Sequence, residues 1–207
     1  MAVPQRTMEK PSETKLGRPD MNSLQETRRL RRIREVEGYL DLILSASSQL
    51  SASIEAKRRV ALRAISLLDE IDRLDGASSD TLYLRGQTYR TLDEHDKAID
   101  CLRRVCDDDP ADVHVWLALG WSYKRLGRLD LAIEALEEAM CQDPAQPIIH
   151  YNLSCYWALA KNVRLSLEYL AQACEINSSF RELVGNEPDF DAIRHDPEFI
   201  GLLNLIA

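Results

Sequence analysis

A period of 34 residues constrains this sequence more than any other feature. The stretches 82–110, 116–144 and 150–178 align without gaps when each is shifted by 34 residues. Self-similarity at such a period is typical of stacked supersecondary units that build one core between neighbours. The matching positions are small at Gly86, Gly120 and Ser154, aromatic at Tyr89, Tyr123 and Trp157, and leucine at Leu102, Leu136 and Leu170.

Within each stretch, apolar and small residues recur at helical spacing. In the middle stretch, one helical face carries Trp116, Leu119, Gly120 and Tyr123. A second face carries Ala132, Leu136 and Ala139. Spacings of three and four residues predict two helices. Gly127 lies between these faces, where a helix can end in a left-handed residue. Asp-Pro at 109–110 and 143–144 marks the next turn, because proline disfavours helix in the preceding residue. Each unit is therefore predicted to be two antiparallel helices joined by a tight turn.

The unit 113–146 resembles the tetratricopeptide repeat, whose signature is W-x2-L-G-x2-Y…A-x3-F…P. The residues that carry the resemblance are Trp116, Leu119, Gly120, Tyr123, Ala132, Leu136 (in place of Phe) and Pro144. The neighbouring units depart from the pattern at Arg85, Asp93, Ser154, Lys161 and Ser178. The resemblance implies an all-α, right-handed superhelix (an α-α solenoid) of antiparallel helix pairs with a C-terminal helical cap.

The repeat pattern and the resemblance together predict six parts of the chain. They are a disordered N-terminal tail (1–22), a degenerate helix pair (23–78), three repeats (79–112, 113–146 and 147–180) and a C-terminal cap (181–207). The first pair is expected to consist of helices over about 23–46 and 56–76, linked by the serine-rich stretch 45–53. The cap resembles the segment that ends many bacterial tetratricopeptide arrays. Its expected contacts to the last helix pair are Phe190, Ile193, Phe199, Leu202 and Leu203.

The resemblance also implies that the first helix of each unit lines a concave groove. The residues expected to bind a partner there are Tyr83, Gln87, Arg90, Leu117, Trp121, Lys124, Arg125 and Tyr151. Aromatic residues and arginine are enriched at binding hot spots. Trp121 followed by two basic residues would suit a peptide with an apolar anchor and an acidic neighbour. The alternative is that the next unit or the cap covers Trp121. The groove lacks the lysine, asparagine and arginine pattern with which some members of the family clamp a C-terminal carboxylate.

The leading hypothesis is a non-catalytic protein-interaction module or scaffold that holds a partner peptide in the concave groove. Two alternatives stay open. One is an assembly or secretion chaperone for a single client, and the other is a self-associating structural protein that forms homo-oligomers.

Charge and composition argue against several other kinds of protein, such as nucleic-acid-binding and membrane-spanning proteins. The net charge is −8, although the first 35 residues carry nine basic and five acidic residues. An acidic body argues against nucleic-acid binding. The basic stretch 28–35 is expected to be the wet face of a helix, with Leu30, Ile33 and Val36 buried on the other face. No apolar run approaches the ~20 residues of a membrane span. Five cysteines without C-x-x-C spacing indicate free thiols and a cytoplasmic protein.

Catalytic motifs are not found in the sequence. The four histidines lack metal-ligand spacing, and neither a G-x-S-x-G elbow nor a P-loop is present. His150 and Cys155 lie five residues apart on one predicted helix, a spacing that does not bring them face to face. The acidic run 107–109 precedes Pro110 and is expected to be a solvated turn. We therefore predict no enzyme activity, no cofactor and no metal.

Overall fold

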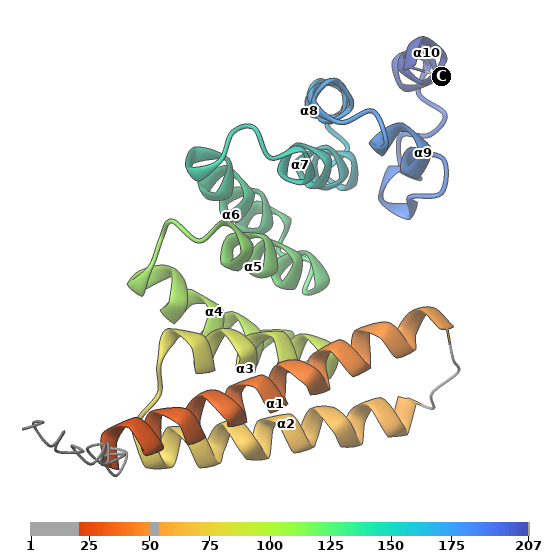
Figure 1. Ribbon diagram of the computed structural model, residues 1–207. Coiled ribbons are helices and arrows are strands. Elements are labelled where there is room, and N and C mark those ends of the chain that lie inside the picture. The colour runs from red at the N-terminus through yellow and green to blue at the C-terminus, as the bar shows by residue number, and fades with distance from the viewer. Residues whose placement is uncertain (1–20, 50–53, 207) are drawn as a thin grey trace, which may run out of the picture.

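Stacked antiparallel helices build the computed structural model of the chain, which describes residues 21–49 and 54–206. The elements are α1 (Met21–Gln49), α2 (Ile54–Asp75), α3 (Ser79–Thr91), α4 (His95–Asp108), α5 (Val113–Arg125), α6 (Leu129–Gln142), α7 (Pro147–Leu159), α8 (Val163–Ile176), α9 (Phe180–Val184), the short 3-10 helix η1 (Pro188–Phe190) and α10 (Pro197–Ile206). Successive pairs follow one another from α1–α2 to α7–α8 (Figure 1). The described residues contain no strand.

The three central pairs repeat with the predicted period. Helices α3, α5 and α7 begin 34 residues apart, and so do α4, α6 and α8. Local sequence signals set their starts. The Ser78 hydroxyl accepts from the backbone N–H of Thr81 at the start of α3, and the Asp112 carboxylate accepts from that of His114 at the start of α5. Such side chains satisfy backbone donors that a helix start leaves free.

Small residues let the two helices of a repeat approach closely. A Cβ on Gly120 would lie 3.2 Å from the carbonyl oxygen of Ala132 and 3.3 Å from Cγ of Leu136. A Cβ on Gly86 would lie 2.9 Å from Leu102. The third repeat fits a serine there, and the Ser154 hydroxyl donates to the carbonyl of Tyr151 at 2.7 Å. The recurring small residue at this position therefore serves the close packing of the two helices.

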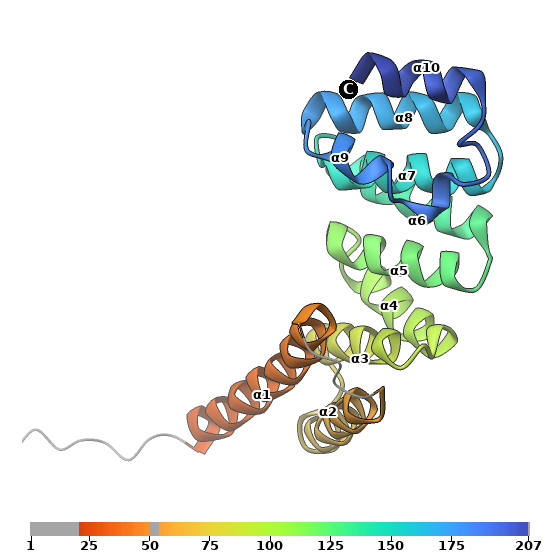
Figure 2. The ribbon, with the colours of Figure 1, turned by 90° about the vertical axis from the view of Figure 1, so that its right-hand side faces the viewer.

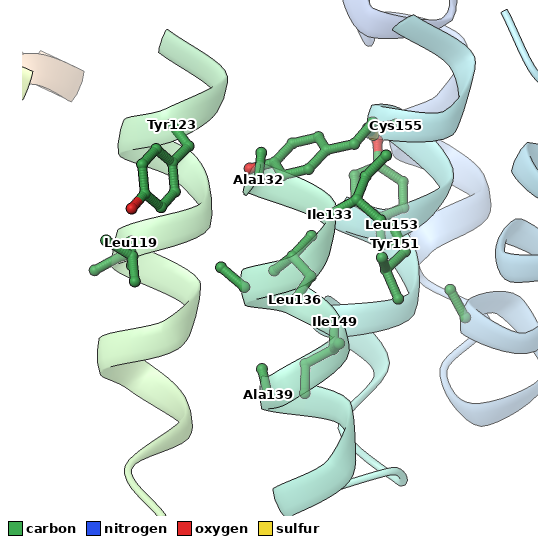
Figure 3. Packing of buried hydrophobic residues seen from close by; sticks show 14 of the residues in the cluster. Leu119, Tyr123, Ala132, Ile133, Leu136, Ala139, Ile149, Tyr151, Leu153 and Cys155 are labelled. Atoms are coloured by element: carbon green, nitrogen blue, oxygen red, sulfur yellow. The ribbon is translucent and has the colours of Figure 1, made fainter. Parts of the chain in front are cut away.

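Two apolar clusters form the core. The larger one runs from Leu82 to Phe199 and contains the repeat leucines, of which Figure 3 shows Leu136 among its neighbours. The smaller one joins α1 and α2 to α3 through Ile33, Val36, Leu40, Ala64, Leu67, Leu68, Ile71 and Leu84. Helix α3 thus contributes Leu82 to one cluster and Leu84 to the other. All five apolar residues expected in the cap belong to the larger cluster or pack against it.

Helix α1 differs from the prediction in two respects. It continues through residues 45–49, where the sequence predicts a link, because that stretch holds no glycine or proline to end a helix. Leu30 was predicted to be buried beside Ile33 and Val36, but it is 45% exposed because the buried stripe instead continues through Leu40 and Ile43. The predicted tail 1–22 lies outside the described residues, except that α1 begins at Met21.

The basic face of α1 contacts the chain itself at two points. Arg32 Nη2 lies 2.8 Å from Glu70 Oε1 of α2, and Arg29 Nη2 donates to the Ser78 hydroxyl at 2.6 Å. Arg28, Arg31 and Arg34 are exposed, in agreement with the expected wet face.

Candidate functional site: a half-filled concave face

The first helices of the successive pairs lie along one face of the stack. Helix α1 contacts α3, and α3 contacts α5. Figure 2 shows α1, α3, α5 and α7 along this face, with α9 in front of α7. This concave face carries the predicted groove residues. It divides into an open N-terminal half and a C-terminal half that the chain itself fills.

The open half is a cleft of about 690 Å³ between α1, α3 and α5. We call it the N-terminal cleft. It is lined by Glu37, Leu40, Asp41, Ile43, Leu44, Lys57, Tyr83, Leu84, Gln87, Arg90, Thr91 and Trp121. Four of the eight predicted binding residues, Tyr83, Gln87, Arg90 and Trp121, therefore line one cavity. Its volume falls within the range of about 300–1,000 Å³ usual for ligand sites.

The α1 wall of this cleft is not among the predicted groove residues. Leu40, Ile43 and Leu44 belong to a helix that does not follow the 34-residue phase, so alignment of the repeats could not place them. The available signal was the stripe of apolar residues that continues beyond Val36 toward the end of α1.

Trp121, on the floor of the cleft, lies at the centre of a cluster of basic side chains. The Arg90 guanidinium carbon lies 4.5 Å from the Trp121 ring centroid, and that of Arg125 lies 5.7 Å away. The His95 ring meets Trp121 edge-on at 5.2 Å. Trp121 is half-buried. These three ring contacts come from α3, α4 and α5, and none of them comes from the C-terminal cap. Cations over an aromatic face are attracted by the ring quadrupole.

Arg90 is the most desolvated cation of this cluster. Burial lowers its pKa, and the nearby Tyr83 and Tyr156 offset part of that effect. Its Nη1 donates to Gln87 Oε1 at 2.5 Å, while its buried Nε has no hydrogen-bond partner in the described structure. Among the described residues, no carboxylate lies within ion-pair distance of Arg90. Its charge is thus only partly compensated.

The C-terminal half of the same face is occupied by α9 and η1. The Tyr151 ring lies 4.8 Å from that of Phe180 and 6.2 Å from that of Phe190. Tyr151 is therefore only 5% exposed, and its predicted availability to a partner is wrong for this arrangement because the cap covers it. Lys124 forms an ion pair with Asp189 of η1.

The remaining predicted groove residues lie outside the cleft. Leu117 is partly buried and packs against the larger cluster. Arg125 is exposed at the rim, where its Nη2 lies 3.4 Å from Asp93 Oδ1.

The residues considered for catalysis or metal binding do not form a reactive site. Burial raises the pKa of the Cys155 thiol, which disfavours the nucleophilic thiolate. His150 Nε2 lies 2.7 Å from the carbonyl oxygen of Pro144. In the described part of the chain, no group of three or more His, Cys, Asp and Glu side chains is placed to hold a metal ion. All five cysteines are free thiols, and Cys141 is exposed.

Over residues 21–49 and 54–206, none of the helices combines the length and apolar character needed to cross a bilayer.

Helix pairs of constant length, stacked with their first helices on an inner face, define the class of α-α solenoid repeat proteins. A family profile described as tetratricopeptide repeat matches residues 83–147 and 117–179. Residues 83–179 therefore carry tetratricopeptide repeats, and the fold of the described residues is the predicted solenoid of antiparallel helix pairs with a C-terminal cap.

Solved structures of MamA share this fold. One crystal structure of MamA has a TM-score of 0.60 at 19% identity, over 76% of this chain and 90% of MamA. A structure of MamA from Desulfovibrio magneticus RS-1 (residue 41 to the end) has a TM-score of 0.56 at 20% identity, over 77% of this chain and 97% of that MamA chain. No curated protein sequence gives a significant match. At this identity the likeness concerns the fold alone.

Proposed function

We propose that this chain is a non-catalytic protein-binding module that holds a segment of a partner protein in its N-terminal cleft. The observation that carries the proposal is the convergence of Tyr83, Gln87, Arg90 and Trp121 on one open cavity. Aromatic and arginine side chains around a cavity are the usual composition of a binding hot spot. The tetratricopeptide fold supports an interaction role in general, and the specific cleft is our assignment.

The geometry favours a segment over a flat protein surface. One wall is the second half of α1, and the floor is formed by α3 and α5. A trough between helices can hold an extended or helical segment, as in the common modes of peptide recognition.

Affinity capture from the native cell tests the proposal. The bait is the full chain, compared with a Tyr83→Ala/Trp121→Ala variant and with a Leu183→Ala control. Leu183 is an exposed apolar residue (51%) on α9, outside the cleft. We expect a specific captured protein to be lost only with the double variant, once circular dichroism shows that all three chains are helical. An unchanged set of captured proteins would refute the cleft as the binding site.

A further inference from the structure

The two basic residues at equivalent positions of the concave face differ in one respect. Arg90 and Lys124 are separated by one repeat of 34 residues. Each lies near an aromatic ring of the following first helix, with Arg90 4.5 Å from the Trp121 centroid and Lys124 5.6 Å from that of Tyr156. Lys124 has the Asp189 carboxylate as its partner, whereas Arg90 lacks any carboxylate partner among the described residues.

The chain's own C-terminal segment shows how this face binds a peptide. Two consecutive residues make the contacts. The Asp189 carboxylate forms an ion pair with Lys124, and the Phe190 ring packs on Tyr151. Phe190 is fully buried and Asp189 is mostly buried. The Glu187 carboxylate fixes the turn by accepting from the backbone N–H of Asp189 at 3.3 Å. The segment thus presents a carboxylate followed directly by an aromatic ring.

The N-terminal cleft offers the same two kinds of contact without an occupant from the described chain. Arg90 supplies a desolvated cation on its floor. Leu40 and Ile43 from α1 face the same cavity as Tyr83 and Trp121. A buried cation gains from a carboxylate partner because its own hydration has already been lost, and an aromatic ring is suited to an apolar trough.

We propose that the N-terminal cleft recognises an acidic–aromatic segment of another protein, in which Asp or Glu directly precedes an aromatic residue. The carboxylate pairs with Arg90, and the ring packs between the α1 wall and Trp121. This assignment rests on the proposed function, since it names the chemistry of the segment that the cleft holds.

The occupant comes from a different protein. The stretches outside the described residues, 1–20, 50–53 and Ala207, contain no Phe, Tyr or Trp. In a second copy of this chain, the aromatic residues that directly follow Asp or Glu are Tyr169, Phe190 and Phe199. Phe190 and Phe199 are fully buried, and Tyr169 lies within α8 with its ring against His150. The exposed Glu37 and Asp41 on the α1 wall would repel a polyacidic peptide. The cleft therefore suits a segment with one acidic residue beside the ring.

Fluorescence anisotropy with a defined peptide tests this assignment. The probe is a labelled peptide that carries Pro-Asp-Phe, the sequence of residues 188–190, between glycine and serine residues. We expect it to bind the full chain. Changing its Asp to Asn, or its Phe to Ala, is expected to weaken binding by roughly tenfold or more. On the protein side, Arg90→Gln should cause a similar loss, while Arg103→Gln, at an exposed arginine of α4, should leave the affinity unchanged.

A charge swap separates recognition from damage to the fold. Arg90→Glu should lose the Pro-Asp-Phe peptide and gain a Pro-Lys-Phe peptide, a result that misfolding cannot produce. Equal binding of the two peptides by the wild type would overturn the assignment. So would loss of binding with Lys124→Met but not with Arg90→Gln, because the peptide would then have displaced the C-terminal segment. A concentration-dependent dimer that disappears with Arg90→Gln would also overturn it, in favour of a second copy.

The two proposals fail in different ways. If the Tyr83→Ala/Trp121→Ala variant loses its captured protein but the wild type ignores the Pro-Asp-Phe peptide, the cleft binds a partner and the acidic–aromatic assignment is wrong. If the peptide binds in an Arg90-dependent manner, the ligand chemistry is supported whichever protein supplies it.

Discussion

At the scale of single residues, the turn inside each repeat requires a left-handed backbone. Asp93, Gly127 and Lys161 occupy equivalent positions and have φ angles of 58°, 71° and 59°. Glycine adopts this region without steric cost, whereas a residue with a Cβ is destabilised there by about 1–2 kcal/mol. At Asp93, an ion pair offsets part of this backbone strain, because the carboxylate lies 3.4 Å from Arg125. Lys161 is exposed, and within the described residues its side chain forms no hydrogen bond or ion pair that would offset the strain.

We expect Lys161→Gly to raise the free energy of unfolding by about 0.5–1 kcal/mol, since relief of strain exceeds the extra entropy of glycine in the unfolded chain. Urea unfolding followed by circular dichroism measures this as a higher midpoint. The matched control is Gly127→Ala, which introduces the same strain and should lower the midpoint. A midpoint that falls with Lys161→Gly would show that the turn does not limit stability.

His95 gives the chain a pH-sensitive group beside Trp121. It is 5% exposed, its Nε2 lies 3.4 Å from the Asp93 carboxylate, and its Nδ1 has no hydrogen-bond partner within the described structure. Burial lowers its pKa, and Arg125 and Arg90 act in the same direction, while Asp93 opposes them. A histidine whose pKa is lowered by folding stabilises the fold above its unfolded pKa of about 6.5. That contribution is lost as the pH falls through the folded value.

The wild type should therefore lose more unfolding free energy than His95→Gln between neutral pH and about pH 5. Urea unfolding of both chains across this range measures the difference, and the subtraction removes the contribution of other titrating groups. Parallel pH profiles would contradict the assigned direction of the His95 pKa.

At the scale of elements, the sequence was sufficient wherever a residue's role repeats. The small position at Gly120 and the leucine at Leu136 recur, so their helices and mutual packing could be predicted from spacing alone. Tyr151 shows the limit. It repeats the groove position of Tyr83, but its surroundings are set by Phe180 and Phe190, which belong to the segment that does not repeat. Alignment of the repeats finds the concave face and cannot show which part of it the chain fills.

Arg85 shows how one departure from the repeat pattern serves a neighbouring element. Leucine is usual at this position, yet Arg85 forms ion pairs of 2.6 Å with both Asp69 and Asp72 of α2. Burial alone would lower the pKa of Arg85, but the hydrogen bonds to the two aspartates raise it above its ordinary value. The arginine thus ties α3 to the first helix pair, which lies out of phase with the repeats.

Apolar burial, more than the basic face of α1, should hold the first pair together. Leu68 of α2 is fully buried, so Leu68→Ala is expected to cost about 2–5 kcal/mol. Arg32→Ala removes an ion pair that is partly exposed on both sides and should cost less than about 1 kcal/mol. Urea unfolding measures both losses. Leu30→Ala is the control for side-chain truncation on α1 and should stay within about 0.5 kcal/mol. A large loss with Leu30→Ala would contradict its exposed position.

At the scale of the whole molecule, stability should be distributed along the stack. Contacts link each helix mainly to its neighbours. The two apolar clusters meet at α3, and only the larger one includes the cap. In such a chain, stability is close to a sum of repeat and nearest-neighbour interface contributions, and the two ends can open separately. The cap packs at the end of the larger cluster, whereas the N-terminal cleft lies where the two clusters meet, between α1, α3 and α5, so damage to the cap should leave the cleft formed.

Hydrogen exchange measured by mass spectrometry tests this independence. Leu170 of α8 is fully buried in the larger cluster, and Leu170→Ala should cost about 2–5 kcal/mol. We expect faster exchange in α7 to α10 and little change in α1 and α2, because those helices pack in the smaller cluster. Leu68→Ala should give the opposite pattern, with faster exchange in α1 and α2. The peptide that binds the N-terminal cleft should then keep its affinity in Leu170→Ala and lose it in Leu68→Ala, because α1 forms one wall of that cleft. A uniform increase in exchange along the chain would instead mean that the stack unfolds as one cooperative unit.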